Sequence, residues 1–121
     1  MASILLVDDA AIMRMMLQEI LEDAGHTVVG EAENGQEAID KYKELNPDLT
    51  LMDITMPKVD GLKGVQMIKE HDKSAKIVMC SAMGQKELVL KAIKAGAKDF
   101  IIKPFEEKRV VESVNRVLGV V

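Results

Sequence analysis

The sequence holds one cysteine, Cys80, so no disulfide can form within its 121 residues. A chain without disulfides is typical of a reducing compartment, and a cytoplasmic location is expected. No run of about 18 apolar residues occurs, so the sequence predicts no transmembrane helix. No basic stretch precedes the short apolar run at the N-terminus, which argues against a signal peptide.

Aromatic residues are almost absent. Tryptophan does not occur, and Tyr42, Phe100 and Phe105 are the only aromatic side chains. Nine methionines supply part of the missing bulk, and 48% of the residues are hydrophobic, which is enough for one core at this length. We find no linker, repeat or low-complexity tract, so residues 1–121 are expected to form one domain without an output domain.

Charge is unevenly distributed along the chain. The formal net charge of −4 argues against general nucleic-acid binding, which needs a concentrated basic patch. Residues 1–83 carry 8 basic and 15 acidic side chains, a net charge of −7. Residues 84–121 carry 8 basic and 5 acidic side chains, a net charge of +3, so the C-terminal third differs in sign from the rest.

Five short apolar runs alternate with five stretches of helical periodicity. The predicted strands are residues 3–7, 27–30, 49–52, 76–80 and 100–102. The predicted helices are approximately residues 12–24, 38–45, 62–68, 85–95 and 110–118. Strict alternation with apolar strands predicts an α/β fold, a doubly wound parallel sheet covered by helices on both faces.

Polar residues follow or end four of the five predicted strands. The first strand is followed by Asp8 and Asp9, the third by Asp53, the fourth by Ser81 and the fifth by Lys103. In a parallel sheet these strand ends share one edge, and ligands bind there at the point where strand order reverses. For the flavodoxin-like strand order 2-1-3-4-5 that point lies between the first and third strands, beside the three aspartates.

A cluster of three carboxylates needs compensation. Two carboxylates ~5 Å apart repel by roughly 3 kcal/mol at an effective dielectric constant of 20. Either one carboxylate takes up a proton or a cation sits between them. An all-oxygen ligand set suits Mg²⁺, which would also let Asp53 act as a nucleophile toward an anionic phosphoryl group. Lys103 and Ser81 would then contact phosphoryl oxygens.

These motifs resemble the receiver domains of bacterial and archaeal two-component signalling, above all the stand-alone receivers of chemotaxis. The resemblance covers essentially the whole chain, and the strand order given above rests on it. The matching segments are Leu-Leu-Val-Asp-Asp-Ala (5–10), Met-Asp-Ile-Thr-Met-Pro (52–57), Asp-Gly (60–61), Cys-Ser-Ala-Met-Gly-Gln (80–85), Ala-Gly-Ala-Lys-Asp-Phe (95–100) and Lys-Pro-Phe (103–105).

The resemblance implies a chemistry for the acidic cluster. Asp53 would accept a phosphoryl group from a chemotaxis histidine kinase. Asp9, Asp53 and the backbone carbonyl of Thr55 would bind Mg²⁺ directly, and Asp8 would act mainly through water. Lys103 would contact the phosphoryl group and precede a cis proline. The protein would catalyse only its own phosphorylation and dephosphorylation.

The resemblance also implies a switch. Ser81 would be the switch hydroxyl, at a position where threonine is also common, and Phe100 the switch aromatic, where tyrosine is frequent. The partner would be a flagellar switch protein or an archaeal motor adaptor, with a phosphatase as a further candidate. Helix 85–95 spreads apolar residues over more than one face, which favours a docking role. We expect a monomer with neither nucleic-acid nor membrane partners.

The residues of the sequence argue against three other classes of protein. Haloacid dehalogenase phosphatases need a second aspartate two residues after the first, where this sequence has Thr55. A flavodoxin needs a hydroxyl-rich phosphate loop, whereas Asp8 and Asp9 would repel phosphate. A pseudo-receiver that only binds partners would not need the complete acidic set together with Ser81 and Lys103.

Several conspicuous residues receive a structural interpretation from the sequence. His26 and His71 show no ligand-like spacing and are expected at the surface. The methionines at positions 13, 15 and 16 are expected to pack inside the domain. Their closeness to Asp9 leaves partner contact as the alternative.

Overall fold

The structure is a computed structural model that describes residues 2–120. Five parallel strands form one sheet in the order β2-β1-β3-β4-β5, which confirms the flavodoxin-like prediction. The strands are β1 (Ser3–Val7), β2 (Thr27–Ala32), β3 (Leu49–Asp53), β4 (Ile77–Ser81) and β5 (Asp99–Ile102). The helices are α1 (Ala11–Asp23), α2 (Gly35–Leu45), α3 (Gly61–His71), α4 (Lys86–Ala95) and α5 (Glu107–Leu118).

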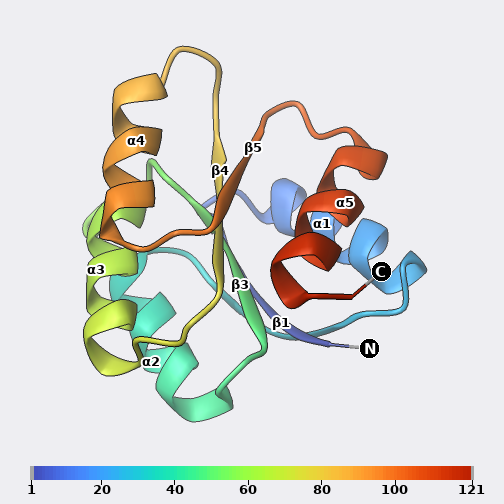
Figure 1. Ribbon diagram of the computed structural model, residues 1–121, viewed down its shortest axis with the longest axis horizontal. Helices are drawn as coiled ribbons and strands as arrows, with labels where there is room; N and C mark the ends of the chain where they lie inside the picture. The colour runs from blue at the N-terminus through green and yellow to red at the C-terminus, as the bar shows by residue number, and fades with distance from the viewer. Residues whose placement is uncertain (1, 121) are drawn as a thin grey trace.

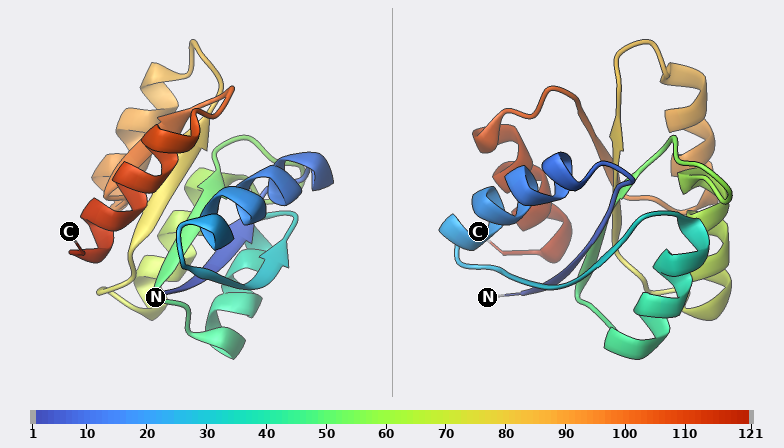
Figure 2. Two further views of the ribbon diagram at one scale, coloured as in Figure 1. Left: turned by 90° about the vertical axis from the view of Figure 1, so that its right-hand side faces the viewer. Right: turned by 180° about the vertical axis from the view of Figure 1, so that it is seen from behind.

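The helices cover both faces of the sheet. Figure 1 shows α2, α3 and α4 on one face and α1 with α5 on the other, and the right-hand view of Figure 2, from behind, shows the same separation. This is the doubly wound arrangement expected from strict alternation of strands and helices. Among residues 2–120, no helix is long and apolar enough to cross a membrane.

Alternate residues of the central strands build two apolar layers. Leu5 and Met52 face the layer under α2, α3 and α4. Leu6 and Leu51 face the layer under α1 and α5. All four are at most 1% exposed. Each such side chain contributes roughly 1.5–3 kcal/mol through burial, so the sheet is a rigid base for the loops at its edges.

Side-chain caps fix the starts of two helices. Asn34 accepts a hydrogen bond from the Glu37 N–H at 2.9 Å and caps α2, where the sequence indicated only a turn. Asp60 accepts from the Lys63 N–H at 3.0 Å and caps α3. Such a cap typically contributes about 1 kcal/mol, and the second one anchors the loop that follows β3.

The surface of α1 differs from the prediction. Ile12, Met15 and Met16 are 58%, 62% and 41% exposed, so the expectation that the methionines pack inside is wrong for Met15 and Met16, whereas Met13 is half-buried. Leu17 and Leu21 are the buried residues of this helix, and the partly buried Ile20 packs beside them. The apolar spacing predicted the helix correctly, but it did not distinguish the buried stripe from apolar residues beside it.

The second strand is longer than predicted. It runs to Ala32 because the pairing with β1 continues through Leu6↔Glu31 and Val7↔Ala32. The pairing shifts register between Ile4 and Leu5, and it continues from there past the acidic residue Glu31. A charged residue near the end of an edge strand is compatible with pairing, although it weakens the apolar signal in the sequence.

Candidate functional site

The predicted site residues meet at the carboxyl edge of the sheet. Asp8 follows β1, Asp53 ends β3, Ser81 ends β4 and Lys103 follows β5. The loops after β3, β4 and β5 leave the sheet at the top of Figure 1. Strand order reverses between β1 and β3, so the aspartates lie at the position where α/β sheets bind ligands.

Three carboxylates form a compact group. Asp8, Asp9 and Asp53 each offer a carboxylate oxygen, and these atoms lie within 4.8 Å of one another. Asp8 and Asp53 are 2% and 6% exposed, whereas Asp9 is exposed. The Ala10 N–H donates to Asp8 Oδ1 at 2.9 Å and fixes that carboxylate. An oxygen-only donor set of this size, open to water on one side, fits Mg²⁺.

Lys103 already compensates part of this negative charge. Its Nζ lies 3.0 Å from Asp8 Oδ2 and 3.3 Å from Asp53 Oδ1. Burial alone would lower the pKa of Lys103, but the hydrogen bond to Asp8 and the charges of Asp53 and Asp8 outweigh it and raise that pKa above its usual value. The lysine therefore stays charged at neutral pH.

The compensation is incomplete at Asp53. Burial, followed by the neighbouring Asp8 carboxylate, raises the pKa of Asp53 above 3.8, and Lys103 opposes only part of this shift. A raised pKa means that the ionised form of Asp53 is disfavoured in the folded protein. A bound cation would therefore stabilise the ionised form of Asp53.

The loop after β3 is held close beneath Asp53. A Cβ at Gly61 would overlap the carbonyl oxygen of Asp53 and come within 2.7 Å of the Cα of Ile54. The Gly61 N–H donates to the Ile54 carbonyl at 3.0 Å. The sequence indicated only a turn at Asp60-Gly61, and the close approach explains why a glycine stands there.

Thr55 lies in this loop, two residues after Asp53, and is exposed. Its hydroxyl accepts a hydrogen bond from Gln85 Nε2 at 2.6 Å. No local signal in the sequence indicates this role of Gln85, because the contact joins two loops that are distant in sequence.

Ser81 and Phe100 line the same apolar hollow. It has a volume of about 380 Å³ and lies between the start of α4 and β5, with Val89 and Leu90 also in its wall. Phe100 is half-buried and also lines a neighbouring hollow of about 580 Å³ together with Pro104. Phe100 thus borders both hollows. The Lys103–Pro104 peptide bond is cis, as expected from the resemblance.

Exposed apolar side chains surround these hollows. Leu90 and Ile102 are 52% and 47% exposed, and Met83 in the loop between β4 and α4 is 79% exposed. Val89 is buried beneath them. The prediction that the fourth helix carries apolar residues on more than one face is confirmed.

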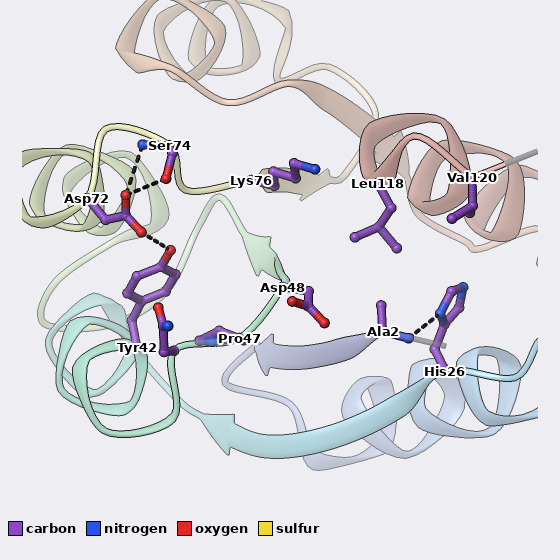
Figure 3. Close-up of a pocket in the computed structure, with 11 residues that line it drawn as sticks. Ala2, His26, Tyr42, Pro47, Asp48, Asp72, Ser74, Lys76, Leu118 and Val120 are labelled. Carbon is purple, nitrogen blue, oxygen red and sulfur yellow. Dashed lines mark hydrogen bonds between the residues drawn. The ribbon is translucent and has the colours of Figure 1, made fainter.

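A separate hollow of about 430 Å³ lies at the other edge of the sheet, among Ala2, His26, Tyr42, Asp48 and nearby residues (Figure 3). The surface position expected for His26 is wrong, since this side chain is 6% exposed. Its Nδ1 accepts the Ala2 N–H at 3.3 Å, and its Nε2 lies 2.9 Å from Asn115 Oδ1. His26 thus joins the residue before β1 to α5, and none of the predicted site residues lines this hollow.

Comparison with known families identifies the class of protein. The response regulator receiver domain family matches residues 4–115, and the chain therefore belongs to this family. It is 59% identical to "Chemotaxis protein CheY" of Thermotoga maritima over 114 residues, which cover 94% of this chain and 95% of that protein. It is 58% identical to "Chemotaxis protein CheY" of Bacillus subtilis over 116 residues, which cover 96% and 97%.

A solved structure agrees with both fold and family. The CheX-CheY-BeF3-Mg+2 complex from Borrelia burgdorferi contains a chain that superimposes with a TM-score of 0.90 and 38% identity, covering 95% of this chain and 87% of that one. The protein is thus a CheY-like receiver domain, and its relatives connect it with chemotaxis. The matching family is one of signalling receivers.

Proposed function

We propose that this protein is a chemotaxis response regulator in which Asp53 accepts a phosphoryl group from a histidine kinase, and that the phosphorylated form changes its affinity for a motility-apparatus partner. The contact of Lys103 with both Asp8 and Asp53 supports this most directly. This contact places the ammonium group of Lys103 beside a buried carboxylate nucleophile, and an incoming anionic phosphoryl group needs such a positive charge.

The transfer follows from the groups at this edge. A carboxylate oxygen of Asp53 attacks phosphorus, and the bond from phosphorus to the donor's histidine nitrogen breaks. The nitrogen keeps the electron pair, and Asp53 becomes an acyl phosphate. Lys103 then pairs with a phosphoryl oxygen in place of the Asp53 carboxylate, and it never needs to release its proton.

The acidic group is proposed to hold Mg²⁺. Asp9, Asp53 and the Thr55 backbone carbonyl would bind it directly, and Asp8, which already engages Lys103, would act through water. When bound, Mg²⁺ would neutralise charge on the phosphoryl oxygens. The hard oxygen donors and the raised pKa of Asp53 both favour a cation here.

Ser81 and Phe100 would transmit the effect of phosphorylation from Asp53 to the surface over α4 and β5. The phosphoryl group adds roughly −1.5 to −2 charges and strong acceptor oxygens, toward which the Ser81 hydroxyl can move. Space then opens in the 380 Å³ hollow that both residues line, and the Phe100 ring can rotate into it. The shape of the surface over α4 and β5 would change as a result.

The proposed partner docks on α4, β5 and α5. This surface combines the exposed Leu90 and Ile102 with the +3 net charge of residues 84–121, so a short amphipathic segment with acidic residues would fit it. A flagellar switch protein or an archaeal motor adaptor would supply that segment. A tenfold preference for the phosphorylated form requires only about 1.4 kcal/mol of differential affinity.

Incubation with acetyl phosphate and Mg²⁺ tests the phosphoryl step. Intact-mass measurement should find one added phosphoryl group on the wild type and none on Asp53→Asn. Asp40→Asn is the matched control, because Asp40 is exposed on α2 and remote from the acidic group. Phosphorylation of Asp53→Asn at the wild-type level would show that the assignment is wrong.

A further inference from the structure

Gln85 bridges two loops of the site. It lies between β4 and α4, where its Oε1 accepts the Ala82 N–H at 2.8 Å and its Nε2 donates to Thr55 Oγ1 at 2.6 Å. The backbone N–H can only donate, so the oxygen of the Gln85 amide must face Ala82 and its nitrogen must face Thr55. One side chain thus connects the segment after Asp53 with the segment after Ser81.

A role as a helix cap does not account for these contacts. Gln85 occupies the cap position of α4, but its side chain accepts no hydrogen bond from the first turn of that helix. Its backbone lies at φ −103° and ψ 29° instead of the extended conformation common for a helix cap. The Oε1 atom holds Ala82 within the loop between β4 and α4, and the Nε2 atom contacts Thr55 in the loop after β3.

We infer that Gln85 is a positioning residue that holds the unphosphorylated arrangement of the site, and that its bond to Ala82 must be released when Ser81 moves toward a phosphoryl group on Asp53. The inference rests on the proposed function. Ser81 and Ala82 share a peptide bond, so a movement of the Ser81 backbone that carries its hydroxyl toward Asp53 also displaces the Ala82 N–H that Gln85 holds.

The second contact makes this restraint specific. Thr55 follows Asp53 by two residues in a loop that Gly61 holds against the Asp53 backbone. The Gln85 amide therefore ties Ala82 to the same loop that carries the proposed metal ligand, and the two loops resist separate movement. Removing the bridge should lower the cost of reaching the phosphorylated arrangement.

Four substitutions separate the two contacts. Gln85→Met keeps the length of the side chain and removes both bonds. Gln85→Glu keeps an acceptor for Ala82 and leaves the Thr55 hydroxyl as the only possible donor in the second contact. Thr55→Val removes the second contact without changing the charge or the Thr55 carbonyl. Lys86→Ala is the matched control, since Lys86 is exposed beside Gln85 and takes no part in the bridge.

The first readout is hydrogen exchange of the Ala82 amide, followed by NMR without any phosphoryl donor. Gln85→Met should accelerate it about fivefold, the effect of losing a hydrogen bond worth about 1 kcal/mol. Gln85→Glu should retain the protection, and Lys86→Ala should match the wild type. Unchanged Ala82 exchange in Gln85→Met would overturn the inference.

The second readout is binding of beryllium fluoride, a phosphoryl mimic, with Mg²⁺ present. Gln85→Met should bind it about fivefold more tightly than the wild type, and combining it with Thr55→Val should give less than the sum of the single effects. If the wild type binds beryllium fluoride and Gln85→Met binds it equally well or more weakly, the inference is overturned but the proposed function is not. A wild type that binds no beryllium fluoride would overturn the proposed function, and the inference with it.

Discussion

Lys103 Nζ lies 3.3 Å from Asp53 Oδ1 although β4 separates the strands that carry the two residues. The lysine side chain reaches across the end of β4 and continues to Asp8, 3.0 Å away. Burial and Asp8 still raise the pKa of Asp53, so one ammonium group does not fully compensate the acidic group. This imbalance leads to the first two predictions.

Asp53→Asn should be more stable than the wild type at neutral pH. Because the pKa of Asp53 is raised in the folded state, folded protein binds more protons than unfolded protein between pH 3.8 and that raised pKa. The unfavourable contribution of Asp53 therefore grows as pH rises through this window and is complete above it. The advantage of the variant should be roughly 1–3 kcal/mol at pH 7 and should vanish below the ordinary aspartate pKa of about 3.9.

Urea unfolding at pH 7 and at a pH below the ordinary aspartate pKa measures this difference in stability. The carboxylates with lowered pKa, such as Asp72 and Asp48, are present in both proteins and cancel in the comparison. Two results would contradict the electrostatic account: Asp53→Asn is no more stable than the wild type at pH 7, or its advantage over the wild type is as large at acid pH as at pH 7.

Millimolar Mg²⁺ should raise the unfolding temperature of the wild type. A ligand that binds only the folded state at a hundred times its Kd adds about 2.7 kcal/mol, which corresponds to several degrees for a domain of this size. Asp9→Asn should lose most of this response, because Asp9, the exposed member of the acidic group, is a proposed direct ligand of the ion. Asp40→Asn should keep it. A wild-type midpoint that does not move with Mg²⁺ would count against a metal site.

Gly61→Ala should destabilise the fold and disturb the site together. The added methyl group would overlap the Asp53 carbonyl oxygen, and backbone atoms cannot move away as a flexible side chain does. We expect a loss of about 1–3 kcal/mol, as for other overpacked positions. Gly25→Ala is the control, because φ there is +92° and, among residues 2–120, no atom beyond the neighbouring residues of the chain lies within 4 Å of the added Cβ, so it tests backbone conformation alone.

The two glycine variants are compared by thermal unfolding and by phosphorylation with acetyl phosphate. Gly25→Ala should cost about 1 kcal/mol from its left-handed backbone and should leave phosphorylation unchanged. Equal phosphorylation by both variants would mean that the close approach of Gly61 does not position Asp53.

The sequence was most informative where one local pattern determines the outcome. Apolar runs ending in Asp8, Asp53 and Ser81 predicted both the strands and the edge at which they meet, since parallel strands share their carboxyl ends. The Lys103 position was predicted too, but its contact with Asp8 depends on side-chain reach across two strands.

Other features depend on tertiary contacts that leave no local signal. His26 is buried because Ala2 and Asn115 supply its hydrogen-bond partners from distant parts of the chain. Met15 is exposed because the buried stripe of α1 is narrower than its apolar sequence. In the sequence, Gln85 looks like an ordinary residue at the start of a helix. Its role depends on the tertiary contact with Thr55, which lies 30 residues earlier in the chain.

Phe100→Ala should separate phosphorylation from output. Phe100 lines the two hollows near α4 and β5, whereas the acidic group lies at the ends of β1 and β3. Phosphorylation by acetyl phosphate should persist, while the preference of a cognate motor or adaptor peptide for the phosphoryl-mimic state should fall from at least about tenfold toward equality. Peptide titration with and without beryllium fluoride measures this preference.

The same titration, followed by NMR, locates the docking surface. Shift changes should concentrate on α4, β5 and α5, where Leu90 and Ile102 are exposed. Equal wild-type affinity in both states would refute the proposed switch, and shift changes confined to α1 and α2 would refute the assignment of the surface.

The central claim is that Asp53 itself carries the phosphoryl group. Borohydride converts an aspartyl phosphate into homoserine, so reduction after treatment with acetyl phosphate and Mg²⁺ marks the modified residue permanently. Peptide mass spectrometry should find homoserine at position 53 and intact aspartate at positions 8 and 9. Homoserine at either of those positions, or phosphorylated protein with unmodified Asp53, would contradict the account.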